Sequence, residues 1–326
     1  MQISILARYA LSCVAVATLA SCGGSQPLVA TGAPRPVFGI PTRNSASSGI
    51  YASEYHNSGS IVYGYRKNNR RNDPPICSES VTYPRGDIAV DGKGNLIVPE
   101  SFGEFSVFKG PGMCGPELGS IYPCCGGGVV DAASADAANG TITIAAFQDG
   151  SSAGSIELCT LKHGCTTNLR NPDMNFVYSV AVARNGDCWA SSEQAESMGS
   201  GGAVLTYFKD CSGSGQTATG YQNAYAGGLD IDVNGNLVSI SATTPAVYVY
   251  SACNPACKTV GGPFSLHGGA IYGHLDKDST YFATADSQYG QVDVYRYSPK
   301  AVTYMYSFNN GLSSSTAVAY NPRSKL

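Results

Sequence analysis

Short apolar runs separated by polar turns follow one another along this chain, and one such unit recurs. In residues 86–96 the apolar run Ile88-Ala89-Val90 leads into a turn from Asp91 to Asn95, and a second apolar run begins at Leu96. Brief apolar runs bounded by turn residues are typical of buried β-strands, and Gly, Asn and Asp favour tight hairpins. We therefore predict a hairpin of two buried strands here.

Equivalent turns recur at a regular spacing. With Asp91 as the first anchor, the equivalent positions are Asp136, Arg184, Asp232, Asp276 and Asn321, separated by 45, 48, 48, 44 and 45 residues. An apolar run precedes the anchor, as at residues 180–182 and 318–320, and Gly, Asn or Asp occupies each turn. A fixed period of this length indicates a repeat architecture.

Each repeat contains further strand-like segments. Second strands are predicted at residues 96–98, 142–144 and 237–240, third strands at 105–108, 203–208, 247–250 and 292–295, and a fourth strand at 119–122. Four strands in roughly 46 residues are typical of one blade of a β-propeller. The fold class that we predict is therefore all-β, a six-bladed β-propeller with four-stranded blades.

The two ends of the repeat region predict how the ring closes. The sixth repeat stops at Leu326, where its second strand should begin, whereas residues 49–55 read as a second strand without a first strand before them. A third strand follows at residues 60–65. The N-terminal strands are therefore expected to complete the blade begun by the C-terminal strand, which leaves no open edge between first and last blades. Residues 45–326 make 282 residues, or 47 for each of six blades.

The repeated unit resembles a known group of propellers. An apolar strand, an Asp-x-x-Gly-Asn-Leu turn and a Val- or Ile-rich strand are similar to the six-bladed propellers of the NHL-repeat and SMP-30/gluconolactonase-like group. The resemblance covers residues 49–326 and implies the fold. It does not select a function, because this architecture hosts hydrolases, lyases and binding proteins alike.

The N-terminus reads as a lipoprotein signal peptide, residues 1–21. Arg8 provides a positive n-region, and residues 10–19 form an apolar segment that is too short to span a bilayer. The following Leu19-Ala20-Ser21-Cys22 resembles the bacterial lipobox, which implies acylation (including palmitate) of Cys22; an ordinary signal peptide with a chance Cys is the alternative. Several acyl chains on one Cys give stable anchoring. Residues 22–44, rich in Gly, Ser, Pro and Ala, then read as a flexible tether, and residues 45–326 as the propeller domain.

Charge and composition exclude one class of partner. Only 13% of residues are charged and the formal net charge is -3, so the chain has no basic surface that would indicate a nucleic-acid partner. We expect the protein in the bacterial cell envelope, in the outer membrane if the bacterium has two membranes, because Gly23 and not Asp follows Cys22.

Ten of the 12 cysteines remain once Cys13 in the signal and Cys22 are set aside, and an even number in an exported chain predicts disulfides. Local pairs are expected for Cys159 with Cys165, Cys253 with Cys257, and Cys188 with Cys211. The partners of Cys77, Cys114, Cys124 and Cys125 remain open, and zinc is the alternative for them, although no CxxC pair is present.

Candidate binding residues are expected at the mouth of the central channel, where loops entering the innermost strands meet loops that follow the second strands. Polar residues near the ends of second strands are Glu54, Glu100, Glu193 and Asp286, and the loops before innermost strands add Tyr83, Arg85, Tyr178, Tyr225 and His267. A ring of carboxylates, with Glu100 and Asp286 as its main candidates, could hold Ca²⁺. The alternative is that all of these are solvated loop residues.

The resemblance to SMP-30-like lactonases implies a Glu, Asn and Asp set that holds a divalent metal, with an Asp as base. Glu54 or Glu100 would stand for the Glu and Asp286 for an Asp, but Ser241 or Thr243 falls where a ligand is needed, and no matching Asn pair is present. The chain also has no nucleophile elbow or P-loop.

Two functions are therefore carried forward. The first is a non-enzymatic, membrane-anchored scaffold that binds a protein, peptide or glycan in the envelope. The second is a metal-dependent hydrolase or lyase of the lactonase-like kind.

Overall fold

The computed structural model describes residues 49–55, 60–69, 73–82, 86–100, 103–110, 113–123, 130–138, 141–148, 154–193, 202–242, 244–251 and 253–321, with the backbone alone at 130–138 and 143–148. These residues belong to one compact unit, Arg43–Leu326. The predicted signal peptide, Cys22 and the predicted tether lie outside the described residues. No helix in the described part of the chain is long and apolar enough to cross a membrane.

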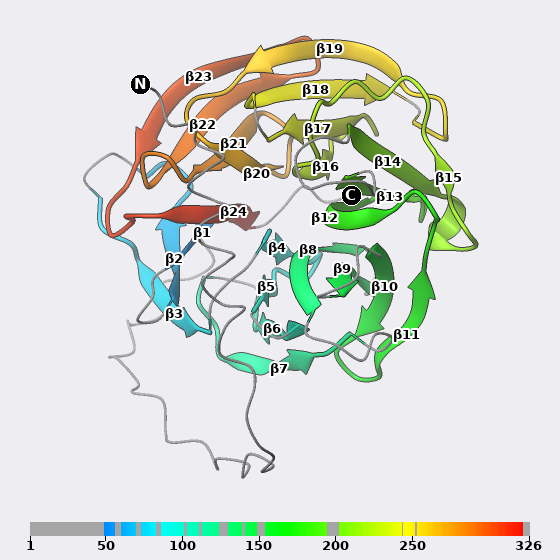
Figure 1. Ribbon diagram of the computed structural model, residues 1–326. Helices are drawn as coiled ribbons and strands as arrows, with labels where there is room; N and C mark the ends of the chain where they lie inside the picture. Colours follow the sequence, from blue (N-terminus) through cyan, green and yellow to red (C-terminus); the bar gives the residue numbers. More distant parts are fainter. Residues whose placement is uncertain are drawn as a thin grey trace, which may run out of the picture. The chain divides into compact units, whose positions relative to one another are not determined.

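The described strands form six four-stranded antiparallel sheets arranged as blades around a centre (Figure 1). Blade 1 contains β24 (Ser315–Asn321), β1 (Gly49–Glu54), β2 (Ser60–Arg66) and β3 (Cys77–Val81). Blade 2 contains β4 (Ala89–Val90), β5 (Leu96–Pro99), β6 (Phe105–Phe108) and β7 (Glu117–Ile121). Blade 3 contains β8 (Val130–Ala138), β9 (Thr141–Gln148), β10 (Gly154–Thr160) and β11 (Gly164–Leu169).

The remaining three blades follow the same order from the innermost to the outermost strand. Blade 4 contains β12 (Asn175–Val182), β13 (Cys188–Glu193), β14 (Ala203–Phe208) and β15 (Gln216–Thr217), with a short 3₁₀ turn, η2 (Lys209–Cys211), after β14. Blade 5 contains β16 (Leu229–Ile231), β17 (Leu237–Ser241), β18 (Ala246–Ser251) and β19 (Lys258–Ser265). Blade 6 contains β20 (Ala270–Leu275), β21 (Tyr281–Asp286), β22 (Gln291–Ser298) and β23 (Ala301–Phe308). The predicted six-bladed propeller is confirmed.

Strands from the two ends of the domain close the ring, as predicted. β24 pairs with β1 in antiparallel register, from Gly49 opposite Asn321 to Glu54 opposite Ser315. Figure 1 shows the C-terminal β24 beside the N-terminal β1, with β2 and β3 outside them. This shared sheet replaces two open edges by a continuous ladder of hydrogen bonds.

The hydrophobic core lies between the blades. Five of the six clusters formed by the described buried side chains join two neighbouring sheets, and the cluster between blades 1 and 2 also includes Tyr272 of blade 6. The cluster between blades 6 and 1, for example, includes Val294 and Phe308 from one sheet and Tyr65 and Tyr320 from the other. Alternate residues of a strand point to opposite faces, so the apolar strands seen in the sequence are buried against both neighbours.

The repeated turn is built by side-chain hydrogen bonds. Asp91 Oδ1 accepts hydrogen bonds from the backbone N–H groups of Lys93 and Asn95, both at 2.8 Å, and Asp91 Oδ2 accepts from Asn95 Nδ2 at 2.7 Å. Asp232 makes the same three contacts, at 2.9 Å each, with Asn234 and Asn236. These residues therefore serve the hairpin turn, on the face opposite the channel mouth.

Candidate functional site

Four carboxylates occupy equivalent positions at the channel mouth, at or just after the end of a second strand. They are Glu54 at the end of β1, Glu100 after β5, Glu193 at the end of β13 and Asp286 at the end of β21. All four are buried. The expectation that they are solvated loop residues is therefore wrong, because the loops in front of the innermost strands cover them.

Three of these carboxylates hold a neighbouring loop by its backbone. Glu54 Oε1 accepts hydrogen bonds from the backbone N–H (2.5 Å) and the hydroxyl (2.6 Å) of Ser313, just before β24. Glu100 Oε2 accepts from the backbone N–H of Thr82 at 2.6 Å. Hydrogen bonds to an ionised acceptor are about twice as strong as neutral ones, so each carboxylate acts as a loop clamp.

Asp286 is the most heavily used of these clamps. Its Oδ1 atom accepts from the backbone N–H groups of Gly269 (3.0 Å), Gln288 (2.9 Å) and Tyr289 (3.2 Å). The backbone of Gly268 lies so close that a Cβ there would be 2.0 Å from either Asp286 oxygen, and its φ is +58°. Only glycine fits this approach, which explains the double glycine at the start of blade 6.

Glu193 forms a hydrogen bond with a side chain, that of Tyr178, instead of with loop backbone. Burial raises the pKa of Glu193, and its hydrogen bond with Tyr178 of β12 opposes that rise. Burial also raises the pKa of Tyr178, and the neighbouring Glu193 raises it further. Burial likewise raises the pKa of Glu100, against hydrogen bonds from Ser106 and Thr82. The mouth thus contains two carboxyl groups, Glu100 and Glu193, whose pKa burial raises from the ordinary value of Glu.

The aromatic and basic candidates that the structure describes come from three different segments: Tyr178 from β12, Tyr225 from the segment before β16 and His267 from the loop before β20. Tyr83 and Arg85 lie outside the described residues, and Tyr225 is half-buried in the segment that leads to β16. His267 is exposed, and its ring centroid lies 4.0 Å from that of Tyr304 on β23. Because β23 is the outermost strand of blade 6, His267 is held beside the rim and does not face the channel as expected.

A buried ionic cluster lies deeper in the ring, and the sequence reasoning missed it. His274 of β20 is buried, with Nε2 at 3.1 Å from Asp87 Oδ2 and Nδ1 at 3.3 Å from Asp230 Oδ2. Burial alone would lower the pKa of His274, but Asp87 and Asp230 outweigh it and raise the pKa to about 10. The imidazolium thus connects blade 6 to blades 2 and 5. The available signal was the placement of ionisable residues two or four positions before a turn anchor, where the other repeats have uncharged residues.

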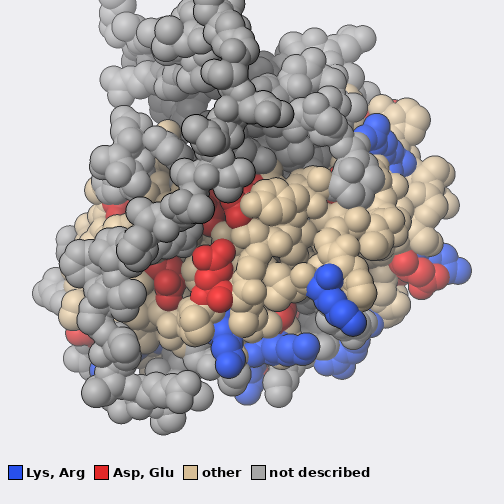
Figure 2. All heavy atoms as spheres, turned by 90° about the horizontal axis from the view of Figure 1, so that it is seen from below, with Lys and Arg blue, Asp and Glu red and all other residues tan. Residues whose placement is uncertain are grey.

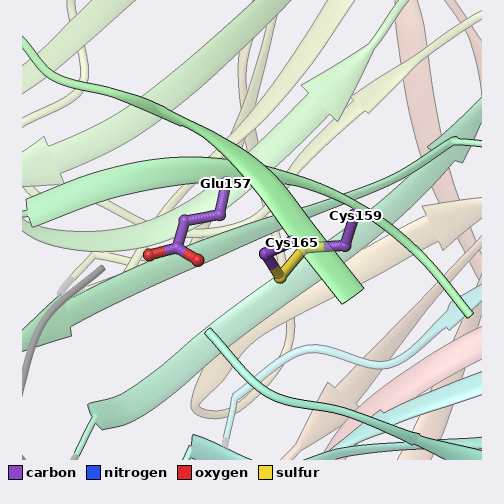
Figure 3. A group of neighbouring side chains, drawn as sticks. All are labelled: Glu157, Cys159 and Cys165. Carbon is purple, nitrogen blue, oxygen red and sulfur yellow. A yellow bond between two sulfur atoms is a disulfide. The ribbon is translucent and has the colours of Figure 1, made fainter. Parts of the chain in front are cut away.

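The metal-ligating groups of the mouth stay apart. Within the described residues, the only three His, Cys, Asp or Glu side chains with ligand atoms within 4.8 Å of one another are Glu157, Cys159 and Cys165 in blade 3. Figure 3 shows that the two sulfur atoms of this group are bonded to each other. Glu157 Oε1 accepts a hydrogen bond from Asn168 Nδ2 at 3.1 Å. Cysteine binds a metal as a thiolate, and both sulfur atoms here are used in a disulfide. The group is therefore a disulfide next to a carboxylate that is hydrogen-bonded to Asn168.

Disulfides join the three pairs of cysteines expected from the sequence, Cys159–Cys165, Cys188–Cys211 and Cys253–Cys257. A fourth bond joins Cys77 of β3 to Cys114 between β6 and β7, and so fastens blade 1 to blade 2. Cys124 and Cys125 lie outside the described residues.

On the part of the face in Figure 2 that described residues form, charged residues do not make up one large patch of a single sign. Lys and Arg, and Asp and Glu, appear there as small separate groups among uncharged residues. This distribution agrees with the low charged fraction of the chain.

Comparisons with known proteins identify the fold. No family model matches the sequence, and no curated protein sequence matches it. A chain from the crystal structure of a nidogen–laminin complex is similar, with a TM-score of 0.62 and 11% identity, over 84% of this chain and 98% of that one. A protein of unknown function from Bacteroides caccae has a TM-score of 0.58 and 8% identity, over 84% of this chain and 98% of that one. A putative 6-phosphogluconolactonase from Bacteroides fragilis has a TM-score of 0.53 and 10% identity, over 86% and 99%. At these identities the likeness shows a shared propeller fold.

Proposed function

We propose that this protein is a binding scaffold of the bacterial cell envelope, anchored by lipid on Cys22, whose propeller binds a protein partner at the channel mouth. The observation that carries the proposal is the use of the mouth carboxylates. Glu54, Glu100 and Asp286 each hold loop backbone. Side chains employed in this way give a preorganised surface, which lowers the ordering cost of binding. The similar propeller from the nidogen–laminin structure comes from a protein complex, which supports a protein partner.

The clamped loops present aromatic side chains. Tyr289 lies three residues after Asp286 in the loop between β21 and β22, and its side chain is 61% exposed. The N–H of Tyr289 is bonded to Asp286, so the backbone beneath this exposed ring is fixed. Exposed tyrosines on a rigid base are typical of the anchor residues of protein interfaces.

A cross-linking experiment tests the partner. A photo-crosslinking amino acid replaces Tyr289 on the mouth face or, as the matched control, Val233 in a turn of the opposite face, where the side chain is 51% exposed. We expect a discrete cross-linked product in intact cells from position 289 alone. The absence of a product at 289, or the same product from 233, would contradict a partner at the mouth.

The anchor has its own test. Cys22→Ala removes the thiol that the lipobox would present for acylation, so the variant should move from the membrane fraction to the soluble fraction. The unmodified chain, fractionated in parallel and extracted with detergent, is the control. Continued membrane association of Cys22→Ala would refute the lipid anchor.

The second candidate function is a metal-dependent hydrolase or lyase, and the likeness to the putative 6-phosphogluconolactonase favours it. Thermal unfolding with Ca²⁺, Mg²⁺ or EDTA tests it, because a ligand that binds the folded state alone raises Tm. If either metal stabilises the chain, Glu100→Ala and Asp286→Ala should abolish the shift. An unchanged Tm with both metals and with EDTA would reject this candidate.

A further inference from the structure

A hollow of about 710 Å³ lies along the outer strand of blade 6. Side chains of blade 6 and of blade 1 line it, among them Lys67, Tyr281, Gln291, Tyr304 and Tyr306. Pockets that bind small ligands usually have volumes of about 300–1,000 Å³. We call this hollow the rim groove.

Aromatic and other apolar surfaces of the rim groove are open to solvent. Tyr304 is 40% exposed and Met305 is 45% exposed, and both are on β23, the edge strand of blade 6. The ring of His267 packs at 35° against the ring of Tyr304, and both line the groove. The outer strand and the loop before β20 therefore bring two aromatic rings together at the groove.

Hydrogen bonds hold this aromatic surface in place. The hydroxyl of Tyr304 lies 2.7 Å from Ser307 Oγ, and Ser307 Oγ donates to Asp293 Oδ1 at 2.5 Å. Gln291 Nε2 donates to the same Asp293 oxygen at 2.9 Å. Asp293 itself is fully buried on β22. The polar side chains that surround the ring of Tyr304 are thus fixed by a carboxylate beneath the surface, which makes the groove a built and preorganised feature.

The groove offers no unpaired ionic group. Lys67 is the only Lys, Arg, Asp or Glu among its described lining residues, and its Nζ lies 2.6 Å from Asp276 Oδ2. The remaining polar groups are the imidazole of His267 and a set of hydroxyls and amides, including Ser307, Gln291, Asn68 and Asn309. This set complements a ligand with an apolar face and a rim of hydroxyls.

We propose that the rim groove binds a neutral oligosaccharide, with a sugar ring stacked on Tyr304 and its hydroxyls bonded to the amide and hydroxyl groups around it. A neutral sugar matches the groove because the apolar C–H face of the ring covers the tyrosine while no charge is left without a partner. Tyr304 lies on the outermost strand of blade 6, and Tyr289 does not line the groove, so the groove would be a second binding function beside the protein partner.

Binding is tested with the purified full chain in detergent, by saturation-transfer NMR and titration. The probes are three neutral hexaoses, maltohexaose, cellohexaose and N-acetylchitohexaose, and one anionic hexaose, hexagalacturonate. We expect at least one neutral hexaose to bind. Tyr304→Ala should weaken that binding about tenfold or more, since one aromatic contact contributes about this factor. Tyr304→Phe, which keeps the ring and loses the hydroxyl, should weaken it less.

The matched control is Tyr289→Ala, which removes an exposed tyrosine of the same blade that does not line the groove. Tyr289→Ala should leave sugar binding unchanged. Tyr304→Ala should in turn leave the cross-link at position 289 unchanged, so each proposed binding function can be rejected without rejecting the other. Unfolding curves of both variants establish that they are folded. The proposal is overturned if no neutral hexaose binds at concentrations up to about 5 mM, if hexagalacturonate alone binds, or if folded Tyr304→Ala binds as well as the unmodified chain.

Discussion

At the scale of single residues, Asp286 shows how a carboxylate at a channel mouth can serve the fold. One of its oxygens accepts three backbone N–H groups, and the other lies 3.4 Å from Gln291 Nε2. A calcium ligand needs its oxygen lone pairs directed at the ion. In Asp286 the protein already uses them to join the loop before β20 to the loop after β21.

We predict that Asp286→Ala lowers the free energy of unfolding by about 2–3 kcal/mol, because buried N–H groups lose a charged acceptor. Asp286→Asn retains an acceptor oxygen at the same place, so it should lower the free energy of unfolding by about half as much. Urea unfolding in the presence and absence of Ca²⁺ measures both. A loss in Asp286→Ala that appears only when Ca²⁺ is present would instead indicate a metal ligand.

At the scale of elements, the blades are connected through loops as well as through packing. The indole Nε1–H of Trp189 on β13 donates to the backbone oxygen of Cys253, after β18, at 2.7 Å. Cys253 is fixed in turn by its disulfide to Cys257. A staple within blade 5 therefore holds the acceptor for a side chain of blade 4. Trp189 is the only tryptophan of the chain and is 7% exposed, so its fluorescence reports on this contact.

The double substitution Cys253→Ser, Cys257→Ser should shift the emission of Trp189 to longer wavelength, since the freed loop exposes the indole to water. It should also lower the free energy of unfolding by about 2 kcal/mol, the loop-entropy contribution of so short a crosslink. Cys159→Ser with Cys165→Ser is the matched control, because it removes a similar staple from blade 3. An identical emission spectrum in both double variants would show that the staple does not position Trp189.

At the scale of the whole ring, the cluster of Asp87, His274 and Asp230 connects three blades across the centre. The folded state raises the pKa of His274 to about 10, whereas the unfolded chain has an ordinary His value of about 6.5. At a pH between these two pKa values, His274 binds a proton when the chain folds. The stabilisation from the imidazolium is therefore complete below about pH 6.5 and is lost as the pH rises toward 10.

We predict that the free energy of unfolding falls between pH 6.5 and 9.5 by up to about 1.4 kcal/mol per pH unit. Denaturant titrations at half-unit intervals measure this slope, and the limit of about 9.5 avoids the tyrosines, which titrate at about pH 10 in the unfolded chain. His274→Gln leaves two buried aspartates without a cation, so its free energy of unfolding at pH 7 should be about 3–5 kcal/mol lower than that of the unmodified chain. The fall of this free energy with pH should also disappear in His274→Gln. A flat profile in the unmodified chain would show that His274 is not charged in the fold.

The sequence by itself determined what is local and periodic. The spacing of the turn anchors defined six blades, and the unpaired strands at the two ends predicted the pairing of β24 with β1. The Asp91 and Asn95 turn followed from residues four positions apart, and the staples at Cys159 and Cys253 from cysteines a few residues from their partners. Such contacts depend on strand period, turn geometry and short loops, all of which adjacent residues encode.

Only the tertiary structure decided which distant residues meet. The bond between Cys77 and Cys114 depends on how blade 1 packs on blade 2, and the approach of His274 to Asp87 depends on the width of the ring. The loop before β20 places His267 at Tyr304 on the rim, although its position in the repeat favoured the channel. The repeat specifies each blade, but the side chains that break the repeat acquire partners only when six blades close around one axis.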